Sequence, residues 1–497
     1  MGLLESVNLK KMLNTLIRMK PFLLTPKDAV ENLKKGIYTV GVFGFGHVGS
    51  VIGIGWGLAG ARVIGMTLDK NAIESFNSGV SPFPEEEYLS KHILALREKH
   101  LLEVTDDYQY GACKSDIKIV AVPAYLSEDK KPDLAPVLEV VKEIGRRLSK
   151  GDVIIVETSL PPGTTRNVIR PILEETSGLN ADEDFALAYS PERISAGTAL
   201  DDFLEKYPKV VGCDSFRSLE LVSELYSAVV KKGVIRMSST IAAETEKLFE
   251  GVYRDVNIAL ANELALFCEK IGVSFDEVHK AANSQPFSHL HNPGIGVGGA
   301  CIPVYPYFIL NVATKYGVKL QITQLSRSIN EQATEIFIRK IINATRFLQK
   351  DPSHCVFALL GLSFRGGTSD TRLSPALKIL SFIEKLGASI RICDPLVRKV
   401  EGKNYEIVRD WRRVVKNVDT IIIASDHREF YEIKIEEASE LAGKDLAILD
   451  GKNVINDFNV KPRHRVLYVG TGRPAFIIKP DGSKERVEIE IYPLQGF

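Results

Sequence analysis

The residue best suited to covalent chemistry is a cysteine that ends a glycine-rich stretch. Residues 289–308 read HLHNPGIGVGGACIPVYPYF, so four glycines precede Cys301 and two prolines follow it. Glycine lets the backbone approach a ligand closely, and a thiolate is a strong nucleophile toward a bound carbonyl group. An isolated cysteine is more often a buried structural residue, but the glycine run favours a reactive thiol here.

A second pattern with chemical meaning is GFGHVG at residues 44–49, between a β-rich run at 37–43 and a helical stretch that reaches Leu58. Its first glycine permits a tight turn, its second lets the backbone approach a pyrophosphate, and its third lets helix and strand pack closely. The helix N-terminus adds amide hydrogens and a positive dipole end for the phosphates. The expected dinucleotide contacts are Gly44, Phe45, Gly46, His47, Val48 and Gly49.

The ribose of a dinucleotide is usually held by an acid at the end of the second strand. That strand, at residues 62–67, ends in Thr67, and the acid is Asp69, two residues later. We therefore expect NAD as the cofactor, with Asp69 acting from the loop. The neighbouring Lys70 leaves NADP open.

Strands and helices alternate regularly after the glycine turn. Strand-like runs lie at 117–122, 152–157, 185–189, 209–212 and 234–237, and helical stretches such as 133–148 separate them. This rhythm predicts a doubly wound parallel sheet, which binds ligands at the carboxyl ends of its strands. Pro123, Ser159 and Glu192 follow strand ends and are candidate pocket residues, although each alone would pass for an ordinary turn residue.

The middle of the chain is expected to form one long helix from Ile241 to Ile271, with serines before it as a cap and Gly272 as its stop. Its apolar residues recur at three- and four-residue spacing, and Lys247 and Arg254 fall on an adjoining face. Such a helix serves as a spine between domains or as a dimer contact. Taken alone, Lys247 is read as a solvated surface lysine.

A second alternation of strands and helices follows. Strands are expected at 354–360, 389–393, 420–424, 446–449 and 466–469, and a hairpin at 476–492. The loop at 361–372 carries Arg365 and Arg372, which suit phosphate binding because arginine is always charged. The expected fold is α/β, with two Rossmann-like doubly wound parallel-sheet domains joined by the long central helix and a helical dimerisation region.

Composition narrows the class of protein. Lys+Arg and Asp+Glu both number 63, so no net charge favours nucleic acid as a partner. Six cysteines without a CxxC pair favour free thiols in a reducing compartment, the cytoplasm, and argue against a structural zinc, so no metal site is expected. No apolar run has membrane-spanning length. Residues 3–24 are expected to form an amphipathic helix packed on the body or on a partner, and a helix lying on a membrane surface is the less favoured alternative.

Together these motifs resemble the UDP-glucose/GDP-mannose dehydrogenase family over about residues 37–473, and within it the branch that oxidises UDP-N-acetylhexosamines. The resemblance rests on GFGHVG from Gly44, ETSLPPGTT from Glu157, SPERISAG from Ser190, KLFEGVYRDVNIALANE from Lys247, PGIGVGGACIPV from Pro293, GLSFRGGTSDTRLSPAL from Gly361, ASDHREF from Ala424 and YVGTGR from Tyr468. It implies four-electron oxidation of the sugar C6 alcohol to a carboxylate with two NAD reduced per sugar, UDP-N-acetyl-D-mannosamine as the first expected substrate, and a homodimer or higher homo-oligomer.

The resemblance also divides the chain into five parts: a helical extension (1–36), an NAD-binding domain (37–238), a central helical dimerisation region with the cysteine loop (239–350), a UDP-sugar-binding domain (351–473) and a hairpin extension (474–497). It gives Cys301 the role of nucleophile, Lys247 that of oxyanion stabiliser, Glu192 that of proton carrier and Ser159 that of holding a water. Cofactor contacts would add Asp69, Pro123, Ser159 and Arg372 to the glycine turn. Substrate contacts would come from Glu192, Arg193, Ile194, Lys247, Arg254, Gly298 and Arg365.

Several departures from the family pattern cluster at these positions. Tyr305 stands where relatives usually have Asp, Gly251 where they have Asn, and Phe287 where a substrate-gripping arginine is expected. Ala300, Ala124 and Thr67 replace a His, a Thr and an Asp. A catalytically impaired paralogue that binds a nucleotide sugar or NAD therefore stays open as an alternative. UDP-glucose 6-dehydrogenase is a further alternative, which Ala196 and Arg193 disfavour.

Overall fold

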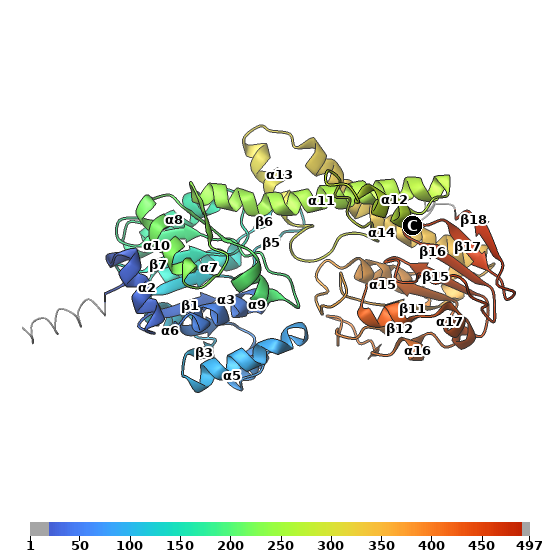
Figure 1. Ribbon diagram of the computed structural model, residues 1–497, viewed down its shortest axis with the longest axis horizontal. Helices are drawn as coiled ribbons and strands as arrows, with labels where there is room; N and C mark the ends of the chain where they lie inside the picture. The colour runs from blue at the N-terminus through green and yellow to red at the C-terminus, as the bar shows by residue number, and fades with distance from the viewer. Residues whose placement is uncertain (1–18, 490–497) are drawn as a thin grey trace, which may run out of the picture. The chain divides into compact units, whose positions relative to one another are not determined.

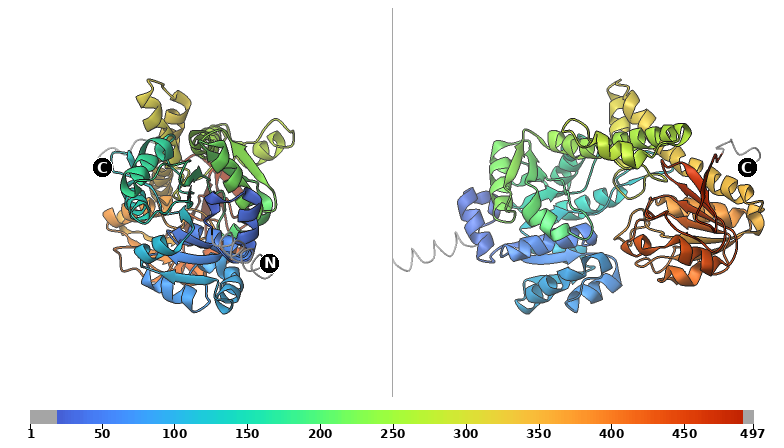
Figure 2. Two further views of the ribbon diagram at one scale, coloured as in Figure 1. Left: turned by 90° about the vertical axis from the view of Figure 1, so that its left-hand side faces the viewer. Right: turned by 45° about the vertical axis from the view of Figure 1, so that its right-hand side comes forward.

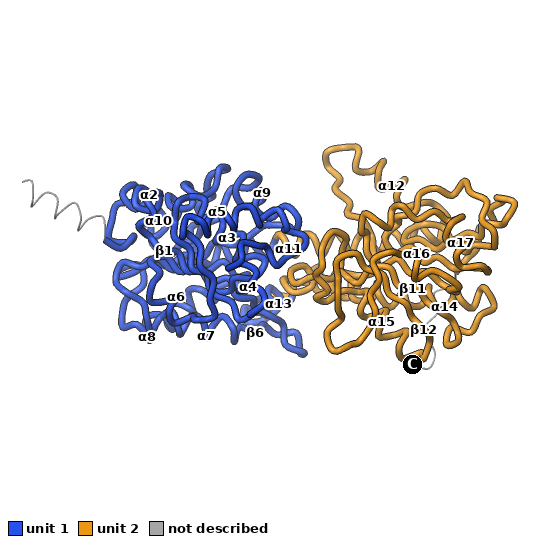
Figure 3. Tube along the Cα trace, turned by 90° about the horizontal axis from the view of Figure 1, so that it is seen from below, with its two compact units in different colours: residues 1–249, 307–316 blue, residues 250–306, 317–497 orange. Residues whose placement is uncertain are grey.

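The computed structural model describes residues 19–489, so most of the amphipathic segment expected at 3–24 lies outside the described part. The chain forms two compact units, coloured separately in Figure 3. The first unit contains the residues up to 249 together with 307–316, and the second contains 250–306 and the residues from 317 onward. The boundary between the units falls inside one long helix.

The first unit is built on an eight-stranded sheet with the order β10-β9-β8-β7-β4-β1-β2-β3 (Figure 1). Its strands are β1 (Thr39–Phe43), β2 (Arg62–Met66), β3 (Leu102–Thr105), β4 (Ile117–Val120), β7 (Val153–Val156), β8 (Ala186–Tyr189), β9 (Lys209–Cys213) and β10 (Val234–Met237). The short strands β5 (Tyr125–Leu126) and β6 (Pro132–Asp133) form a separate hairpin. Every strand predicted for this half is present, and β3, β5 and β6 are additions.

The sheet is not parallel throughout, which corrects the expectation for its last two strands. Strand β9 runs antiparallel to β8, and β10 runs parallel to β9. An antiparallel neighbour begins at the edge of the sheet where the preceding strand ends. Residues 190–208 therefore stay at the carboxyl edge of the parallel strands instead of crossing a face of the sheet, and they carry Glu192 to that edge.

Alternating side chains of these strands enter two separate apolar layers. Val40, Val42, Ile117 and Ile119 belong to one layer, whereas Val120 belongs to the other. Helices α2 (Pro26–Lys34), α3 (His47–Leu58), α5 (Ser90–Glu98) and α10 (Phe216–Ser227) cover the first layer, and α6 (Tyr108–Lys114), α7 (Ala135–Gly145) and α8 (Arg170–Ser177) cover the second. The period of two is that of strands buried on both faces. Helices α4 (Lys70–Asn77) and α9 (Ala199–Asp201) complete the unit.

The described part of the N-terminal extension packs onto the first unit. Phe22 is buried, the Arg217 guanidinium lies 4.1 Å from its ring centroid, and Arg217 donates to the Phe22 carbonyl at 2.6 Å. The Lys20 ammonium lies 2.6 Å from Asp116 and 3.0 Å from Asp152. These contacts make residues 19–36 part of the folded unit although they precede the first strand.

The second unit repeats the architecture, with the strand order β13-β12-β11-β14-β15-β16-β17-β18. The strands are β11 (Val356–Leu360), β12 (Ser389–Cys393), β13 (Ile407–Val408), β14 (Thr420–Ile423), β15 (Leu446–Asp450), β16 (Val466–Gly470), β17 (Ala475–Ile478) and β18 (Lys484–Val487). Strands β11 to β16 are parallel, and β17 and β18 form an antiparallel hairpin at one edge (Figure 2). The hairpin predicted at 476–492 is present, but its second strand ends at Val487, and residues 490–492 lie outside the described part.

Helices enclose this second sheet as well. Helices α14 (Gln321–Phe347) and α15 (Pro375–Lys385) cover one apolar layer, and α16 (Trp411–Val414) and α17 (Ile435–Ala442) cover the other. Helix α11 (Thr240–Ile271) matches the predicted long helix, with the Ser239 hydroxyl accepting from the Ala242 amide at 3.1 Å and Gly272 in the left-handed region at φ +82°. Helix α12 (Phe275–Ala282) belongs to the second unit, whereas residues 307–315 of helix α13 (Tyr305–Lys315) belong to the first. No helix within residues 19–489 is long and apolar enough to cross a membrane.

Candidate active site

The glycine turn after β1 has the geometry of a dinucleotide-binding turn. Gly44 has φ +103°, and a Cβ there would lie 2.6 Å from the Val122 amide nitrogen. A Cβ on Gly49 would lie 2.1 Å from the Gly44 carbonyl oxygen. A Cβ on Gly46 would meet nothing within 4 Å, so this position faces open space at the start of α3. The turn thus has two glycines required by packing, whereas the role of Gly46 toward a pyrophosphate stays a prediction.

The carboxyl ends of the neighbouring strands lie around this turn. The Thr158 hydroxyl donates to the Val122 carbonyl at 2.7 Å, which holds the segments carrying Pro123 and Ser159 together. Asp69 follows β2, and its carboxylate accepts from the Asn71 and Ala72 amides at 3.0 and 3.2 Å as the cap of α4. The expected cofactor residues of this unit therefore gather at one edge of the sheet.

Glu192 lies on the segment that the antiparallel strand β9 keeps at this edge. The Lys209 ammonium donates to the Pro191 carbonyl at 3.1 Å, and the Ser190 hydroxyl donates to the Val210 carbonyl at 2.7 Å, so the backbone before Glu192 is fixed on both sides. Burial raises the pKa of Glu192 to about 7, although Lys247 and Lys209 oppose the rise. A carboxyl group with a pKa near 7 is suited to proton transfer at neutral pH.

Lys247 lies close enough to Glu192 for its charge to lower the pKa of that carboxyl group. The sequence alone does not show that the two residues are close together. Lys247 is 9% exposed, so it is not the solvated lysine of the simpler interpretation. Arg193 donates to the Pro208 carbonyl and lies 3.8 Å from Glu246, while Ile194 packs against the first apolar layer. Arg193 and Ile194, both expected to bind substrate, thus already contact other residues of the first unit.

In the second unit the glycine run lies against the loop between β11 and α15. A Cβ on Gly298 would lie 2.6 Å from Phe364 Cβ, and one on Gly296 would lie 2.3 Å from Thr334 Oγ1. The Gly299 amide donates to the Arg372 carbonyl at 2.8 Å. Gly296 and Gly298 are required because the backbone of the cysteine loop packs directly on its neighbours there, whereas a Cβ on Gly294 would meet nothing within 4 Å.

A buried hydrogen-bond chain fixes the start of the same loop. The Gly294 amide donates to Asn262 Oδ1 at 2.8 Å, and Asn262 Nδ2 donates to Asn330 Oδ1 at 2.9 Å. Asn330 Nδ2 donates to the Asp255 carboxylate at 2.8 Å, and Arg327 lies 2.9 Å from that carboxylate. Helices α11 and α14 therefore set the position of the loop.

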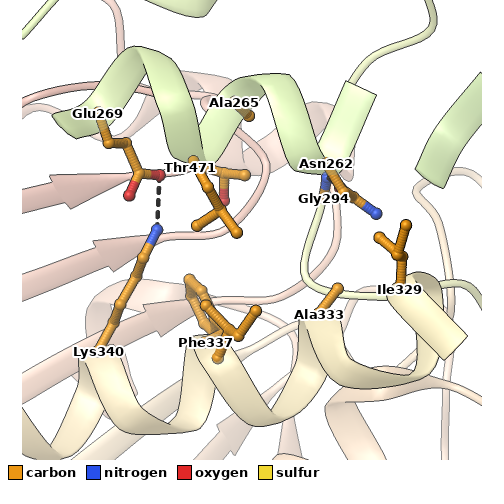
Figure 4. A pocket seen from close by; sticks show the side chains of 11 residues that line it. Asn262, Ala265, Glu269, Gly294, Ile329, Ala333, Phe337, Lys340 and Thr471 are labelled. Atoms are coloured by element: carbon orange, nitrogen blue, oxygen red, sulfur yellow. Dashed lines mark hydrogen bonds and ion pairs between the residues drawn. The ribbon is translucent and has the colours of Figure 1, made fainter. Parts of the chain in front are cut away.

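A small cavity of about 40 Å³ lies behind Gly294, between α11 and α14 (Figure 4). Glu269 and Lys340 face each other across one end of it at 2.6 Å, and Asn262 lies at the other end. A space of this size holds about one water molecule and excludes a nucleotide or sugar. The cavity therefore belongs to the support of the loop.

Cys301 ends this glycine run with an exposed side chain. Its carbonyl accepts from the Val304 and Tyr305 amides, both at 3.0 Å, at the start of α13. By contrast, Cys268, the cysteine on the neighbouring helix α11, is buried. The accessibility that a nucleophile needs is thus present.

A cleft of about 510 Å³ opens at the carboxyl ends of the second sheet. The expected substrate residues Arg254, Gly298 and Arg365 all line it, and Ile302, next to Cys301, lines it as well. Its remaining lining is Ile258, Asp276, Asn292, Pro293, Gly294, Gly296, Val297, Phe364, Asp426, Tyr431, Lys452, Asn453, Asn456 and Arg473. A cleft of this size and this number of cationic side chains suits a phosphorylated ligand.

Lys452 was not predicted from the sequence, although its position after a strand and a glycine was a usable signal. Its side chain is partly buried, and burial lowers its pKa although Asp426 opposes the change. Arg473 is held by Asp276 at 2.5 Å and by Asn456 Oδ1 at 2.8 Å. Arg372 is absent from the lining of this cleft and pairs with Asp370 at 2.6 Å, so its role toward the cofactor stays a prediction.

The turn after β11 lacks the free acid of a dinucleotide site. Asp394 directly follows β12, where such an acid would hold a ribose. Its Oδ2 instead accepts from the Leu362 amide at 2.8 Å and lies 3.4 Å from His427 Nε2. Asp394 is completely buried. The second sheet therefore offers its ligand the cleft and not a second dinucleotide turn. Within the described chain no group of three or more His, Cys, Asp or Glu could hold a metal ion.

A dinucleotide turn on one α/β unit and a cationic cleft on another define a nucleotide-dependent dehydrogenase of the two-sheet type. Three family profiles match in order: "UDP-glucose/GDP-mannose dehydrogenase family, NAD binding domain" at residues 38–230, its "central domain" at 241–332, and its "UDP binding domain" at 358–457. The chain belongs to the UDP-glucose/GDP-mannose dehydrogenase family. The predicted resemblance is confirmed, and the protein is an NAD-dependent nucleotide-sugar dehydrogenase.

Known relatives cover nearly the whole family region. UDP-N-acetyl-D-mannosamine dehydrogenase from Pyrococcus horikoshii is 33% identical over 437 residues, which are 87% of this chain and 99% of the relative. UDP-N-acetyl-D-glucosamine 6-dehydrogenase from Pseudomonas aeruginosa is 30% identical over 84% of this chain and 97% of its own. A solved UDP-D-ManNAc dehydrogenase from Pyrococcus horikoshii has a TM-score of 0.78 at 32% identity, covering 88% of this chain and 99% of that chain.

Proposed function

We propose that the protein oxidises the C6 hydroxyl of a UDP-N-acetylhexosamine, in the first place UDP-N-acetyl-D-mannosamine, to the uronate. The observation that carries the proposal is the cleft of about 510 Å³ at the second sheet, because Arg254, Gly298 and Arg365 line it and Cys301 lies one residue from its wall at Ile302. The names of the relatives from Pyrococcus and Pseudomonas support an N-acetylated sugar. Arg254 and Arg365 would bind the diphosphate of the substrate.

The first unit would hold NAD at the glycine turn, with the pyrophosphate against Gly46 and the ribose near Asp69. The open space at Gly46 fits this group, because only there does the turn leave room for it. Bound NAD accepts a hydride at each of the two oxidation steps. Pro123 and Ser159 would line the nicotinamide end of the site, and Ser159 would hold a water molecule there.

The residues of the chain would carry the rest of the reaction. Oxidation of the alcohol gives an aldehyde, and the Cys301 sulfur adds to its carbon to form a thiohemiacetal. Loss of a second hydride gives a thioester, and water hydrolyses this to the carboxylate and the free thiol. Lys247 would stabilise the negative charge that develops on the sugar oxygen, and Glu192 would take the proton from the attacking water.

The pH dependence of turnover should report the proton carrier. Because Glu192 has a pKa raised to about 7 by burial, it is protonated below that pH and able to accept a proton above it. Activity should therefore rise with pH through about 7. Glu192→Gln should remove this rise of activity with pH, the acidic limb of the pH profile, and lower kcat by about 10²–10³-fold. The measurement is kcat/KM for the sugar between pH 5.5 and 9, in buffers of roughly constant ionic strength.

A second buried carboxyl group provides the control for that profile. Burial raises the pKa of Glu244 to about 7 as well, although the Gly163 and Thr165 amides donate to it at 2.5 and 2.7 Å. Glu244→Gln should keep the activity limb, because Glu244 is used to fix the turn at 163–165. A limb that disappears in Glu244→Gln and persists in Glu192→Gln would reject the assignment.

One observation favours a second candidate, a paralogue that binds its ligands without turnover. The ring of Tyr305 occupies the space beside Gly251, where relatives are expected to carry Asp and Asn. The two candidates are separated by mixing the protein with NAD and UDP-ManNAc, UDP-GlcNAc, UDP-GalNAc or UDP-glucose. The dehydrogenase proposal expects two NADH for each sugar consumed. Ligand binding by calorimetry without any NADH in this screen would favour the paralogue.

We further propose that the protein is a homodimer that uses α11. Five large apolar side chains are exposed on this helix: Phe249, Tyr253, Leu260, Phe267 and Ile271. Their spacing places them on one face of it, and such a stripe favours association. Phe267→Glu should yield monomers by light scattering, whereas Phe216→Glu, at an exposed position on α10, should leave the assembly unchanged. A monomeric wild-type protein at micromolar concentration would rule out the dimer.

A further inference from the structure

The two departures from the family pattern at positions 251 and 305 are one contact in the structure. A Cβ built on Gly251 would lie 2.4 Å from Tyr305 Cδ2 and 3.2 Å from Tyr305 Cβ and Cγ. No real Cβ approaches a ring carbon that closely, so any other residue at 251 would displace the ring. Tyr305 itself is only 7% exposed, which shows that the ring is packed and not loosely placed.

The backbone of Tyr305 is tied to the cysteine. Its amide donates to the Cys301 carbonyl at 3.0 Å in the turn that begins α13. The side chains of Ile302, Val304 and Phe308 around it are buried too. The Tyr305 ring is therefore a rigid extension of the loop that carries the Cys301 sulfur.

Gly251 occupies a defined place on α11. It follows Lys247 by four residues and precedes Arg254 by three, so helical spacing puts the three positions on one face. Arg254 lines the cleft of the second unit. The Tyr305 ring thus presses the cysteine loop against the turn of α11 that carries residues of the proposed site.

We propose that Gly251 and Tyr305 are a compensated pair in which Tyr305 is a positioning residue for Cys301. The ring sets how closely the loop approaches α11, and Gly251 is the recess that admits it. The inference rests on the proposed function only in taking Cys301 as the reacting thiol. It predicts that Tyr305 acts through its ring, so Tyr305→Phe, which keeps the ring, should keep the position of the loop.

A glycine-to-alanine change gives the decisive test, because its effect should reverse sign between two backgrounds. In the middle of a helix, alanine normally stabilises relative to glycine. In the wild type, Gly251→Ala should lower the melting temperature because the methyl group meets the ring. In a Tyr305→Ala background, the same change should raise the melting temperature by about 2 °C. A Gly251→Ala effect of the same sign and size in both backgrounds would overturn the pairing.

Reactivity of the thiol separates positioning from simple stability. Iodoacetamide alkylation is followed peptide by peptide, with the exposed Cys113 as an internal reference. Tyr305→Phe should alkylate at Cys301 within about twofold of the wild type, whereas Tyr305→Ala and Gly251→Ala should each change that rate at least about threefold without affecting Cys113. Unchanged rates at Cys301 in both variants would reject the positioning role.

If the wild-type protein oxidises a UDP-sugar, steady-state kinetics of the same variants complete the test. Gly251→Ala should lower kcat by at least about tenfold and leave KM for NAD within about twofold, because the nucleotide turn is untouched. Tyr305→Phe should retain kcat, and an equal loss in Tyr305→Phe would contradict the ring as the acting group. If the wild type oxidises no UDP-sugar, the proposed function fails, while the melting and alkylation arms still decide the pairing.

Discussion

Cys301→Ser should abolish formation of the uronic acid while leaving NAD binding intact. Serine keeps the shape of the side chain but is a much weaker nucleophile than a thiolate at neutral pH. We expect acid formation to fall by at least about 10³-fold. The glycine turn is unchanged, so calorimetric titration with NAD should give the wild-type dissociation constant.

The matched control is Cys113→Ser. Cys113 is the other exposed cysteine of the chain, and it lies on α6. The same chemical change there should leave acid formation within about twofold of the wild type, because surface substitutions away from a site have small effects. Acid formation by Cys301→Ser at more than about a tenth of the wild-type rate would contradict covalent catalysis at this residue.

Gly46→Ala should abolish productive binding of NAD without destabilising the fold. Gly46 has φ −88° and ψ −155°, which alanine adopts readily, and its Cβ would meet no atom within 4 Å. The added methyl group would stand where the pyrophosphate must approach the helix. KM for NAD should rise by more than about tenfold, and the melting temperature of the protein without ligand should stay within about 1 °C.

Gly49→Ala distinguishes packing from binding at the same turn. Its Cβ would lie 2.1 Å from the Gly44 carbonyl oxygen, so this variant should lose stability in addition to NAD binding. Thermal melting of both variants with and without NAD makes the comparison. Wild-type affinity for NAD in Gly46→Ala would show that the cofactor does not use this turn.

The repeating elements could be predicted from sequence because their signals are local. The strand–glycine–helix pattern at 44–49 and the periodicity of α11 each lie within one continuous segment, and both are present at the expected residues. β3 was missed because it is a short edge strand with Glu103 exposed, so it has no continuous apolar run. The reversed direction of β9 could not be predicted, since strand direction depends on the path of residues 190–208 and not on the strand itself.

The candidate site could be predicted in part for the same reason. Arg254, Gly298 and Arg365 come from three distant segments, and the structure places all three in one cleft. Lys452 joins them because parallel strands end at a common edge, and its position just after β15 and Gly451 was the sequence signal that could have identified it. Gly251 and Tyr305 were identified separately as departures, and their contact follows only from the folded chain.

The proposed mechanism requires a covalent bond between the Cys301 sulfur and the oxidised carbon of the sugar. Glu192→Gln should slow hydrolysis of the thioester and so let it accumulate. Wild-type and Glu192→Gln protein are each mixed with NAD and UDP-N-acetyl-D-mannosamine, quenched with acid and digested, and the peptide masses are measured by mass spectrometry. We predict that the peptide containing Cys301 gains the mass of the sugar acyl group and that Cys113 and the other cysteines gain none. Wild-type protein that forms two NADH per sugar while this peptide stays unmodified in both proteins, under quench conditions that preserve thioesters, would contradict the account.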